Sequence, residues 1–494
     1  MYKETLVKDL NRLAGLESAA YSLARRMTGI GIAVVFLAIV WVAASVMTAG
    51  ADNQAFIIAA GVVGGYMAIN IGANDVANNV GPAVGARSLT LVGALIIAGI
   101  FESAGAIIAG GDVVKTISKD IIDASLISDA RVFMWAMLSA LLAAALWINF
   151  ATYVNAPVST THAIVGAVMG AGVSAAGIAV VDWQVMAAIA ASWVVSPLLG
   201  GAIAAVFLAL IKSRIIYQPD KVAGARRWVP VLVALMAGVF SSYLVMKGLK
   251  NLWKAGPWTV AAVGVSVYAV TYAVVRPLIR RRAKGMENRN KSIRALFHLP
   301  LICAAALLSF AHGSNDVANA VGPLAAIVAT ATTHNITAAV GIPPWVMFIG
   351  AAGITMGLLL FGPRLIRIVG DQITRMNPMR AYCVALSAAI TVIIASALGL
   401  PISSTHTAVG AVFGVGFLRE YYTTRRTHIV HGRVMKAPTP PSDWERLPPT
   451  EKAKRRKLVR RQHLWTIIAA WLITVPLSAA FAAAIFLALR ALLG

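Results

Sequence analysis

Apolar runs long enough to cross a lipid bilayer recur along this chain, from near Gly29 to near Ala488. A bilayer-crossing helix needs about 20 apolar residues. Only 13% of the 494 residues are charged, whereas a soluble protein carries roughly 25%. Because a helix satisfies every backbone polar group within its own segment, we predict an all-α polytopic membrane protein.

The apolar runs predict about 12–13 membrane segments, and thirteen candidate ranges can be assigned. They lie near 29–50, 55–81, 88–110, 132–153, 157–181, 183–211, 229–247, 257–279, 297–329, 345–361, 381–400, 402–418 and 464–490.

Basic residues concentrate between the predicted segments. The net charge is +24, and the positive-inside bias with attraction to anionic lipid explains it better than nucleic-acid binding does. We therefore place the basic regions in the cytoplasm and expect no nucleic-acid partner. These regions are the leader, 212–227, 276–296, 362–380 and 419–463. On this assignment Lys247, Lys250 and Lys254 lie outside, against the bias.

For all basic regions to share one side, the segments 157–181 and 402–418 must each make a net crossing, as full spans or as re-entrant helices. The predicted organisation is a cytoplasmic leader (1–28), a first transmembrane repeat (29–211), linking spans with a basic loop (212–296), a second, inverted repeat (297–418), a basic proline-containing cytoplasmic loop expected to be partly disordered (419–463) and a final span (464–494).

Two polar motifs occur twice, in the same order. GANDVANNVGPAVGA at 72–86 recurs as GSNDVANAVGPLAAI at 313–327, and PVSTTHAIVGAVMGAG at 157–172 recurs as PISSTHTAVGAVFGVG at 401–416. The charge assignment makes the two halves run in opposite directions. An inverted repeat is typical of secondary transporters that bind substrate near the bilayer midplane, although channels contain such repeats too.

Asp75 and Asp316 stand at the centre of the first motif pair. An unpaired aspartate inside a membrane costs about 2.5–3.5 kcal/mol, so it usually faces a cavity or a cation. Neighbouring asparagines at helical spacing add oxygen ligands of the kind that hard cations such as sodium take. These asparagines are Asn74 and Asn78, with Asn315 and Asn319. The alternative is that they only join helices by hydrogen bonds.

The glycines and proline around the first motif, Gly72, Gly81 and Pro82, predict a break in the helix that frees backbone groups.

The second motif pair has the character of a helix N-terminus. Pro157 and Pro401 suit a first helical turn, where unpaired amides attract an oxyanion. Hydroxyl groups follow each proline, and two such helix ends could clamp a tetrahedral anion. The hydroxyl residues are Ser159, Thr160 and Thr161, with Ser403, Ser404 and Thr405. Hydrogen bonding of the hydroxyls to the preceding turn is the alternative.

Three further polar residues lie in apolar segments. His162 and His406 are expected to make structural hydrogen bonds, with proton relay or metal ligation as alternatives. Glu102 has no matching carboxylate in 348-FIGAAG-353, which favours a second cation site or a salt bridge.

No nucleotide-binding fingerprint and no polar catalytic cluster occur in the sequence. A membrane-embedded hydrolase built on His162 and His406 would need such a cluster. The chain is therefore not expected to be an enzyme or to use a cofactor, and an ion gradient is the more natural energy source.

At these motifs the sequence resembles the inorganic phosphate transporter family, which includes sodium–phosphate symporters. The resemblance is carried by GANDVAN, FAHGSNDVANAVGP and the two P-x-S-x-T-H stretches. The resemblance implies a homodimeric inverted-repeat transporter that moves inorganic phosphate with a cation through the cell membrane. GANDVAN and Glu102 favour sodium over the proton. A sulfate permease of the same family and a passive anion channel are the rival functions.

The resemblance assigns residues to two kinds of site. Phosphate would be held by Asn74, Asp75, Ser159, Thr160, Thr161, Asn315, Asp316, Ser403, Ser404 and Thr405. The cation would be held by Asp75, Asn78, Glu102, Asp316 and Asn319, and no metal site beyond one for sodium is expected.

Overall fold

The computed structural model describes residues 27–127, 129–154, 158–248, 255–333, 336, 341–363, 365–366, 376–424, 427–430, 433–436 and 462–493. Nearly all of them are helical, and helices occupy all thirteen predicted segments. The all-α prediction is therefore confirmed.

Ten helices in this described part are apolar and long enough to cross a membrane. They are Met27–Met47, Gln54–Gly85, Leu91–Ala109, Ala130–Tyr153, Trp183–Ile216, Lys221–Gly248, Pro257–Arg282, His298–Thr333, Pro378–Ala397 and Leu472–Leu492. Thr160–Ala176 and Pro344–Leu360 are apolar but shorter.

The first half runs from α2 to α7. Its elements are α2 (Gln54–Gly85), α3 (Leu91–Ala109), α4 (Gly111–Lys115), the π-helical turn η1 (Thr116–Asp120), the 3₁₀ turn η2 (Ala124–Leu126), α5 (Ala130–Tyr153), α6 (Thr160–Ala176), the 3₁₀ turn η3 (Ile178–Val180) and α7 (Trp183–Ile211). A π-helical turn, η4 (Lys212–Ile216), continues α7.

A helical hairpin links the halves, and the second half follows it. The link contains α8 (Lys221–Tyr243), the π-helical turn η5 (Leu244–Gly248), α9 (Pro257–Arg282) and α10 (Asn290–Leu296). The second half contains α11 (His298–Asp316), α12 (Ala318–Thr333), α13 (Pro344–Leu360), α15 (Pro378–Ala397), α16 (Ser404–Thr424), β1 (Thr427–Val430), β2 (Arg433–Lys436) and α18 (Gln462–Leu493).

The predicted leader and the predicted insert 419–463 fall largely outside the described residues. Within the insert, α16 continues to Thr424, and β1 pairs with β2 as an antiparallel hairpin in which Thr427 faces Lys436 and Val430 faces Arg433.

Polar side chains mark the starts of several helices. The Asp129 carboxylate accepts from the Arg131 amide at 2.8 Å, and Asp182 accepts from the Gln184 amide at 3.0 Å. Asn377 caps α15 by accepting from the Arg380 amide at 2.9 Å. Short polar acceptors at these positions satisfy amides that lack a partner within the helix.

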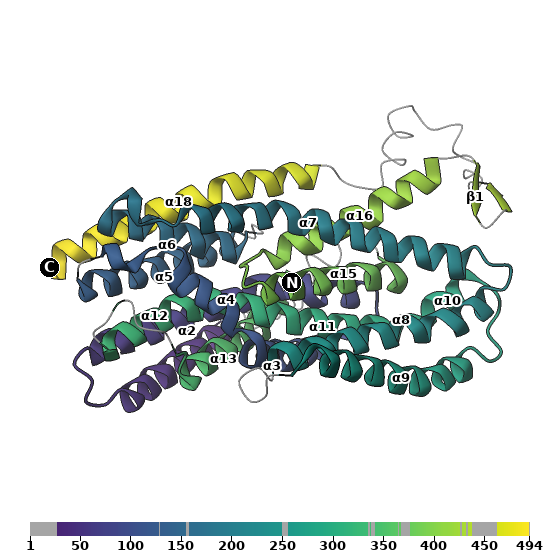
Figure 1. Ribbon diagram of the computed structural model, residues 1–494, viewed down its shortest axis with the longest axis horizontal. Coiled ribbons are helices and arrows are strands. Elements are labelled where there is room, and N and C mark those ends of the chain that lie inside the picture. The colour runs from purple at the N-terminus through teal and green to yellow at the C-terminus, as the bar shows by residue number, and fades with distance from the viewer. Residues whose placement is uncertain are drawn as a thin grey trace, which may run out of the picture.

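The two halves are interlocked. Helix α3 of the first half packs against α11 of the second, and α13 of the second half packs against α2 of the first. The same exchange occurs between α18 and α6 and between α16 and α7, which Figure 1 shows as helices running side by side. Each half therefore supplies partners that the other half needs for burial.

Glycine contacts reveal which residues are equivalent. A Cβ added at Gly313 would lie 2.0 Å from the carbonyl oxygen of Glu102, and one at Gly72 would lie 1.9 Å from that of Ile354. Because Gly72 and Gly313 occupy the same place in the repeat, Ile354 is the counterpart of Glu102. The sequence comparison placed the counterpart of Glu102 in the FIGAAG stretch, which ends one residue before Ile354. The expectation that the second half lacks a matching carboxylate is nevertheless correct.

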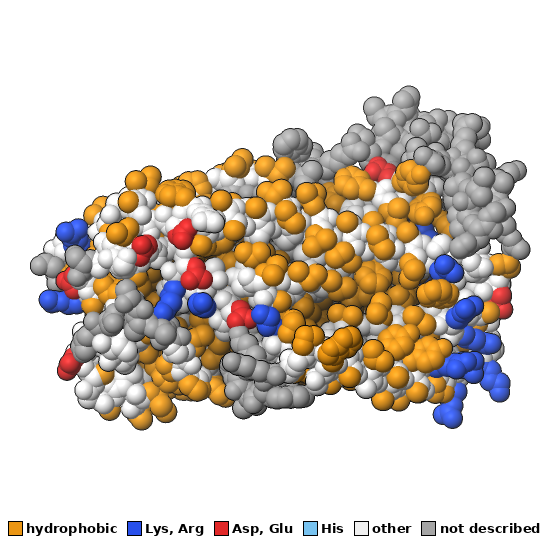
Figure 2. All heavy atoms as spheres, viewed as in Figure 1, with side chains coloured by type: hydrophobic (Ala, Val, Ile, Leu, Met, Phe, Trp, Pro, Cys, Tyr) orange, Lys and Arg blue, Asp and Glu red, His pale blue; other side chains and the backbone are white. Residues whose placement is uncertain are grey.

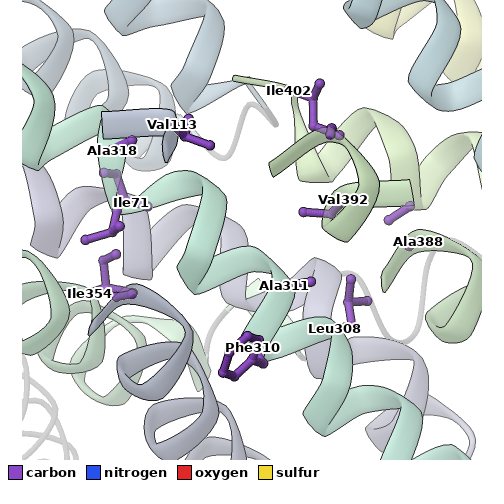
Figure 3. Close-up of a cluster of buried hydrophobic side chains, with 14 of the residues drawn as sticks. Ile71, Val113, Leu308, Phe310, Ala311, Ala318, Ile354, Ala388, Val392 and Ile402 are labelled. Carbon is purple, nitrogen blue, oxygen red and sulfur yellow. The ribbon is translucent and has the colours of Figure 1, made fainter. Parts of the chain in front are cut away.

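Apolar side chains from many helices fill the space around these contacts. Ile71 of α2 and Ile354 of α13 lie next to each other in a buried cluster that also includes residues of α11, α12 and α15 (Figure 3). Hydrophobic side chains also cover most of the long flank of the molecule, whereas Lys and Arg gather at the end where α9 and α10 lie (Figure 2). This distribution suits a membrane protein with one basic end.

The two copies of the first motif differ in backbone. Helix α2 runs without interruption from Gln54 to Gly85, although it contains Pro82. In the second copy α11 and α12 are separated by Val317 alone, which keeps a helical backbone, and the bond from its amide to the Gly313 oxygen is stretched to 3.4 Å. The break predicted around Gly72, Gly81 and Pro82 does not occur, because α2 accommodates the proline within one continuous helix.

One of the lysines predicted to lie outside is neutralised. Lys247 Nζ lies 2.9 Å from the Asp112 carboxylate, and this pair ties the end of α8 to α4. Lys250 and Lys254 lie outside the described residues.

Candidate functional site

The four motif copies converge inside the protein. Asn74, Asp75 and Asn78 lie on α2, and Asn315, Asp316 and Asn319 lie on α11 and α12. The hydroxyl residues lie at the starts of α6 and α16. All of these side chains are buried except Asn78, which is half-buried.

The Asp75 carboxylate contacts hydroxyl groups from both halves. Thr160 donates to one of its oxygens at 2.9 Å, and Thr405 donates to the other at 3.0 Å. The Asn78 amide donates to the Thr405 hydroxyl at 2.8 Å. Asp75 is therefore connected to the first turns of both α6 and α16.

The second copy makes the corresponding contacts. Ser404 donates to the Asp316 carboxylate at 3.2 Å, as Thr160 does to Asp75. The Asn319 amide lies 3.3 Å from the Thr160 hydroxyl and 3.2 Å from that of Thr161. The pseudo-twofold relation between the halves thus extends to individual hydrogen bonds.

Asn74 and Asn315 face the helices that precede the hydroxyl clusters. Asn74 donates to the Thr152 hydroxyl at 3.1 Å, and Asn315 donates to the Ser396 hydroxyl at 3.0 Å. Asn315 also accepts from the Ile402 amide at 3.2 Å. In this conformation Asn74 binds the end of α5, whereas Asn315 binds the end of α15 and the connection before α16.

Ser159 and Ser403 act as helix caps. The Ser159 hydroxyl accepts from the His162 amide and the Ser403 hydroxyl from the His406 amide, each at 3.2 Å. Helix α16 consequently begins at Ser404, three residues after Pro401. The expectation that Pro401 occupies the first helical turn is wrong, because the serine cap sets the start; Pro157 lies outside the described residues.

His162 and His406 meet between α6 and α16. Their ring centroids are 5.0 Å apart in an edge-on arrangement, and His162 stacks on Trp193 at 3.7 Å. His162 Nδ1 lies 2.7 Å from the Ser159 hydroxyl. These contacts favour the structural role expected for the two histidines.

His312 is a central residue that the sequence analysis missed. Its Nε2 lies 3.1 Å from the Asp316 carboxylate and 3.9 Å from that of Asp75. The three side chains offer ligand atoms that all lie within 4.8 Å of one another. The available signal was the His312–Asp316 spacing in FAHGSND, which puts both residues on one face of a helix.

Glu102 joins this group from α3. It is fully buried, and one of its oxygens accepts from the Asn79 amide at 2.7 Å and lies 3.4 Å from His312 Nδ1. The counterpart of His312 in the first copy is Ile71, as Ile354 is that of Glu102. The Glu102–His312 contact therefore exists on one side of the pseudo-twofold axis only.

Several buried oxygen atoms of the described site accept no hydrogen bond. They are Asp316 Oδ1, Asn319 Oδ1, Asn79 Oδ1 and Glu102 Oε2. Buried polar atoms are nearly always paired, and oxygens of these types are the ligands that hard cations take. In addition, Pro82 and Pro323 cannot donate to the backbone oxygens of Asn78 and Asn319. These oxygen atoms are suitable ligands for a small cation such as sodium.

The sequence is similar to those of known proteins. A sequence profile of the phosphate transporter family matches residues 71–482. A candidate phosphate permease of Helicobacter pylori strain J99 is 42% identical, over 97% of this chain and 98% of its own length. One from Pyrococcus abyssi is 35% identical, over 88% of this chain and 98% of its own length.

A solved structure described as the sodium-dependent phosphate transporter shares the fold. It superposes with a TM-score of 0.78 at 35% identity and covers 89% of this chain and 100% of its own. With the membrane-spanning helices, these similarities identify a multi-pass transporter and not an enzyme. The resemblance seen in the duplicated motifs is confirmed: the chain belongs to the phosphate transporter family.

Proposed function

We propose that this protein is a sodium-coupled symporter of inorganic phosphate that works by alternating access. The observation that carries the proposal is the sharing of Asp75 between Thr160 and Thr405, one hydroxyl from each half. A site built jointly by two inverted halves can open to either side as the halves rock against each other.

Phosphate binding is supported by the two helix N-termini. Thr160 and Thr161 lie in the first turn of α6, and Ser404 and Thr405 lie in that of α16. Backbone amides in a first turn have no acceptor within the helix and, with the positive end of the helix dipole, attract anions. The hydroxyl groups beside them supply further donors to phosphate oxygens.

Cation coupling is supported by the charge of the same site. Three carboxylates, those of Asp75, Glu102 and Asp316, lie in one buried cluster around the His312 imidazole. A phosphate anion entering beside these carboxylates would be repelled strongly in so dry an environment. Cations that bind the unpaired oxygens would remove this repulsion, so the anion and the cation bind best together.

Sodium is preferred to the proton in this proposal because the unpaired groups include amide oxygens. Asn319 Oδ1 and Asn79 Oδ1 are buried without a donor. An amide oxygen can coordinate sodium but does not take up a proton at ordinary pH. Placement in the cell membrane and assembly as a homodimer, both implied by the family resemblance, belong to the same proposal.

The deciding experiment is phosphate uptake into proteoliposomes that contain the purified protein. An inward sodium gradient and an inward proton gradient are imposed separately, with choline replacing sodium in the control. Accumulation above equilibrium that requires sodium supports the proposal, whereas accumulation driven by protons alone would identify another coupling ion. Flux that persists after an ionophore collapses both gradients would instead show a passive channel. Abolition of uptake by equimolar sulfate would remove the specificity for phosphate.

A further inference from the structure

Four basic side chains meet at one end of the molecule, away from the aspartates. Lys212 follows α7, Arg294 lies in the last turn of α10, Arg380 in the first turn of α15, and Arg419 near the end of α16. Helix α16 packs against α7 and α15, and α10 contacts α15. These four residues are called the basic cluster below.

The charges of the basic cluster act on one another. Lys212 lies within range of the charges of Arg380 and Arg419, and Arg294 lies within range of the same two arginines. Lys212, Arg380 and Arg419 are half-buried, and Arg294 is exposed. Like charges that are partly shielded from water repel more strongly than they would in solution, so an anion bound among them would be stabilised.

Lys212 is held in place by aromatic rings and does not extend freely into water. Its Nζ lies 4.3 Å from the centroid of the Tyr422 ring. Tyr217 packs edge-on against Tyr422 with ring centroids 6.0 Å apart. A lysine on an aromatic face keeps its charge at a fixed position, where it can interact with an anion.

Arg380 occupies an unfavourable place on its helix. Cations are stabilised at helix C-termini, where Lys212 and Arg294 lie, and anions are stabilised at N-termini. Arg380 lies in the first turn of α15, which carries no acidic residue. An anion bound at this point would interact favourably with both the Arg380 guanidinium and the helix end.

The elements that form the basic cluster contribute little negative charge. Within α7, η4, α10, α15 and α16 the sequence contains one carboxylate, that of Glu420. Arg419 stands fourteen positions beyond Thr405 on α16, about 21 Å along the helix at 1.5 Å per residue. The cluster is therefore separate from the site around Asp75.

We propose that the basic cluster is a second anion site, which binds a phosphate group at the end of the molecule that the positive-inside bias assigns to the cytoplasm. Arginine guanidinium groups bind phosphate oxygens in a bidentate manner, and lysine adds a point charge. The phosphate group comes from one of two sources, the headgroup of an anionic phospholipid or free inorganic phosphate.

The test uses the full-length protein in nanodiscs of phosphatidylcholine, with unfolding followed by intrinsic tryptophan fluorescence. In one arm phosphatidylglycerol replaces increasing fractions of the lipid, and in the other inorganic phosphate is titrated at constant lipid composition. The test protein carries Lys212→Gln with Arg380→Gln. The matched control carries Arg281→Gln with Arg282→Gln, two exposed residues in the last turn of α9 whose replacement changes the net charge equally.

The proposal expects the test protein to need about 25-fold more of one ligand than wild type for the same stabilisation, since each of the two lost cations contributes about fivefold to the binding of an anionic group. The control should match wild type. If the test protein needs more phosphatidylglycerol, the ligand is a lipid headgroup. If it needs more inorganic phosphate, the ligand is free phosphate. Phosphate bound at the site around Asp75 affects the test and control proteins alike.

The proposal would be overturned if the test and control proteins needed the same ligand concentration for half-maximal stabilisation (the midpoint) in both arms. If the double variant does not fold, Arg380→Gln alone carries the same comparison against Arg281→Gln, with about a fivefold shift expected for the loss of one charge. An unchanged midpoint for Arg380→Gln would then overturn it.

Discussion

The hydroxyl of Thr405 donates to the carboxylate of Asp75 at 3.0 Å, across 330 residues of sequence. The other oxygen of the same carboxylate accepts from Thr160, which belongs to the first half. Asp75 is thus held by the first turns of α6 and α16 at once. Any movement of one half against the other must change its environment, which makes the two aspartates the first residues to test.

Replacement of either aspartate by asparagine is expected to abolish phosphate accumulation. Asp75→Asn and Asp316→Asn keep the size of the side chain but remove a charge that, in a buried site, is a far stronger cation ligand than an amide. Accumulation in proteoliposomes under a sodium gradient should fall at least about a hundredfold, which corresponds to loss of about 2.7 kcal/mol of binding.

Asp129→Asn is the matched control for this loss. Asp129 is an exposed cap at the start of α5, and asparagine caps a helix about as well as aspartate does. All three variants should insert into the membrane in normal amounts. Near-normal accumulation by Asp75→Asn or Asp316→Asn would remove that residue from the transport site.

Glu102→Gln is expected to weaken the dependence of uptake on sodium. The substitution keeps an oxygen that can accept from Asn79 but removes a charge beside His312. The sodium concentration for half-maximal uptake should rise about tenfold, equivalent to about 1.4 kcal/mol. Ser103→Ala, which removes the neighbouring hydroxyl bonded to Thr355, should leave it nearly unchanged. An unaltered sodium dependence in Glu102→Gln would exclude Glu102 from the cation site.

The duplicated motifs predicted much of this site because their chemistry is local. An aspartate flanked by asparagines can bind a cation wherever its helix lies. Hydroxyl groups at a helix start can likewise bind an anion. The convergence of Asp75 with both hydroxyl clusters followed from the symmetry of the repeat. His312 was missed because its counterpart is the apolar Ile71, so the repeat itself gave no signal for it.

The interlocking of the halves could not be predicted from hydropathy. An apolar run shows that a helix is buried or lipid-facing, but it does not identify the partner helix. Packing of α3 on α11 and of α13 on α2 depends on glycines at which two backbones approach closely. The stretched helical bond at Val317 could not be predicted either, because the two motif copies are almost identical in sequence there.

The close approach at Gly313 predicts a strong effect of Gly313→Ala. The new methyl group would lie 2.0 Å from the carbonyl oxygen of Glu102, so α3 and α11 would have to separate. Overpacking of this kind typically costs about 1–3 kcal/mol or more. The unfolding temperature and the monodisperse yield in detergent should both fall. Gly111→Ala is the control, since nothing lies within 4 Å of the added atom; equal loss in both variants would contradict the close packing of α3 and α11.

The Lys247–Asp112 pair is expected to contribute little to stability. Its atoms are 2.9 Å apart, but the side chains are 23% and 26% exposed, and ion pairs open to water are typically worth less than about 1 kcal/mol. A double-mutant cycle with Lys247→Met and Asp112→Asn, read as unfolding free energies, should give a coupling below that value. A larger coupling would show that the pair is an important connection between the linking hairpin and the first half.

Ser403 and Thr405 stand two residues apart, and their variants should separate a capping role from a binding role. Ser403 accepts from the His406 amide, which asparagine can also do. Ser403→Asn should therefore keep the unfolding temperature and most of the uptake, whereas Ser403→Ala should lose about 1 kcal/mol of stability.

Thr405→Val has the opposite expected profile. It removes the donor to Asp75 and the acceptor for Asn78 while leaving the cap of α16 intact. The phosphate concentration for half-maximal uptake should rise about tenfold, because one charge-assisted hydrogen bond is lost, with a smaller change in unfolding temperature than Ser403→Ala shows. If Ser403→Asn raised this concentration as much as Thr405→Val, the Ser403 hydroxyl would itself be a phosphate ligand.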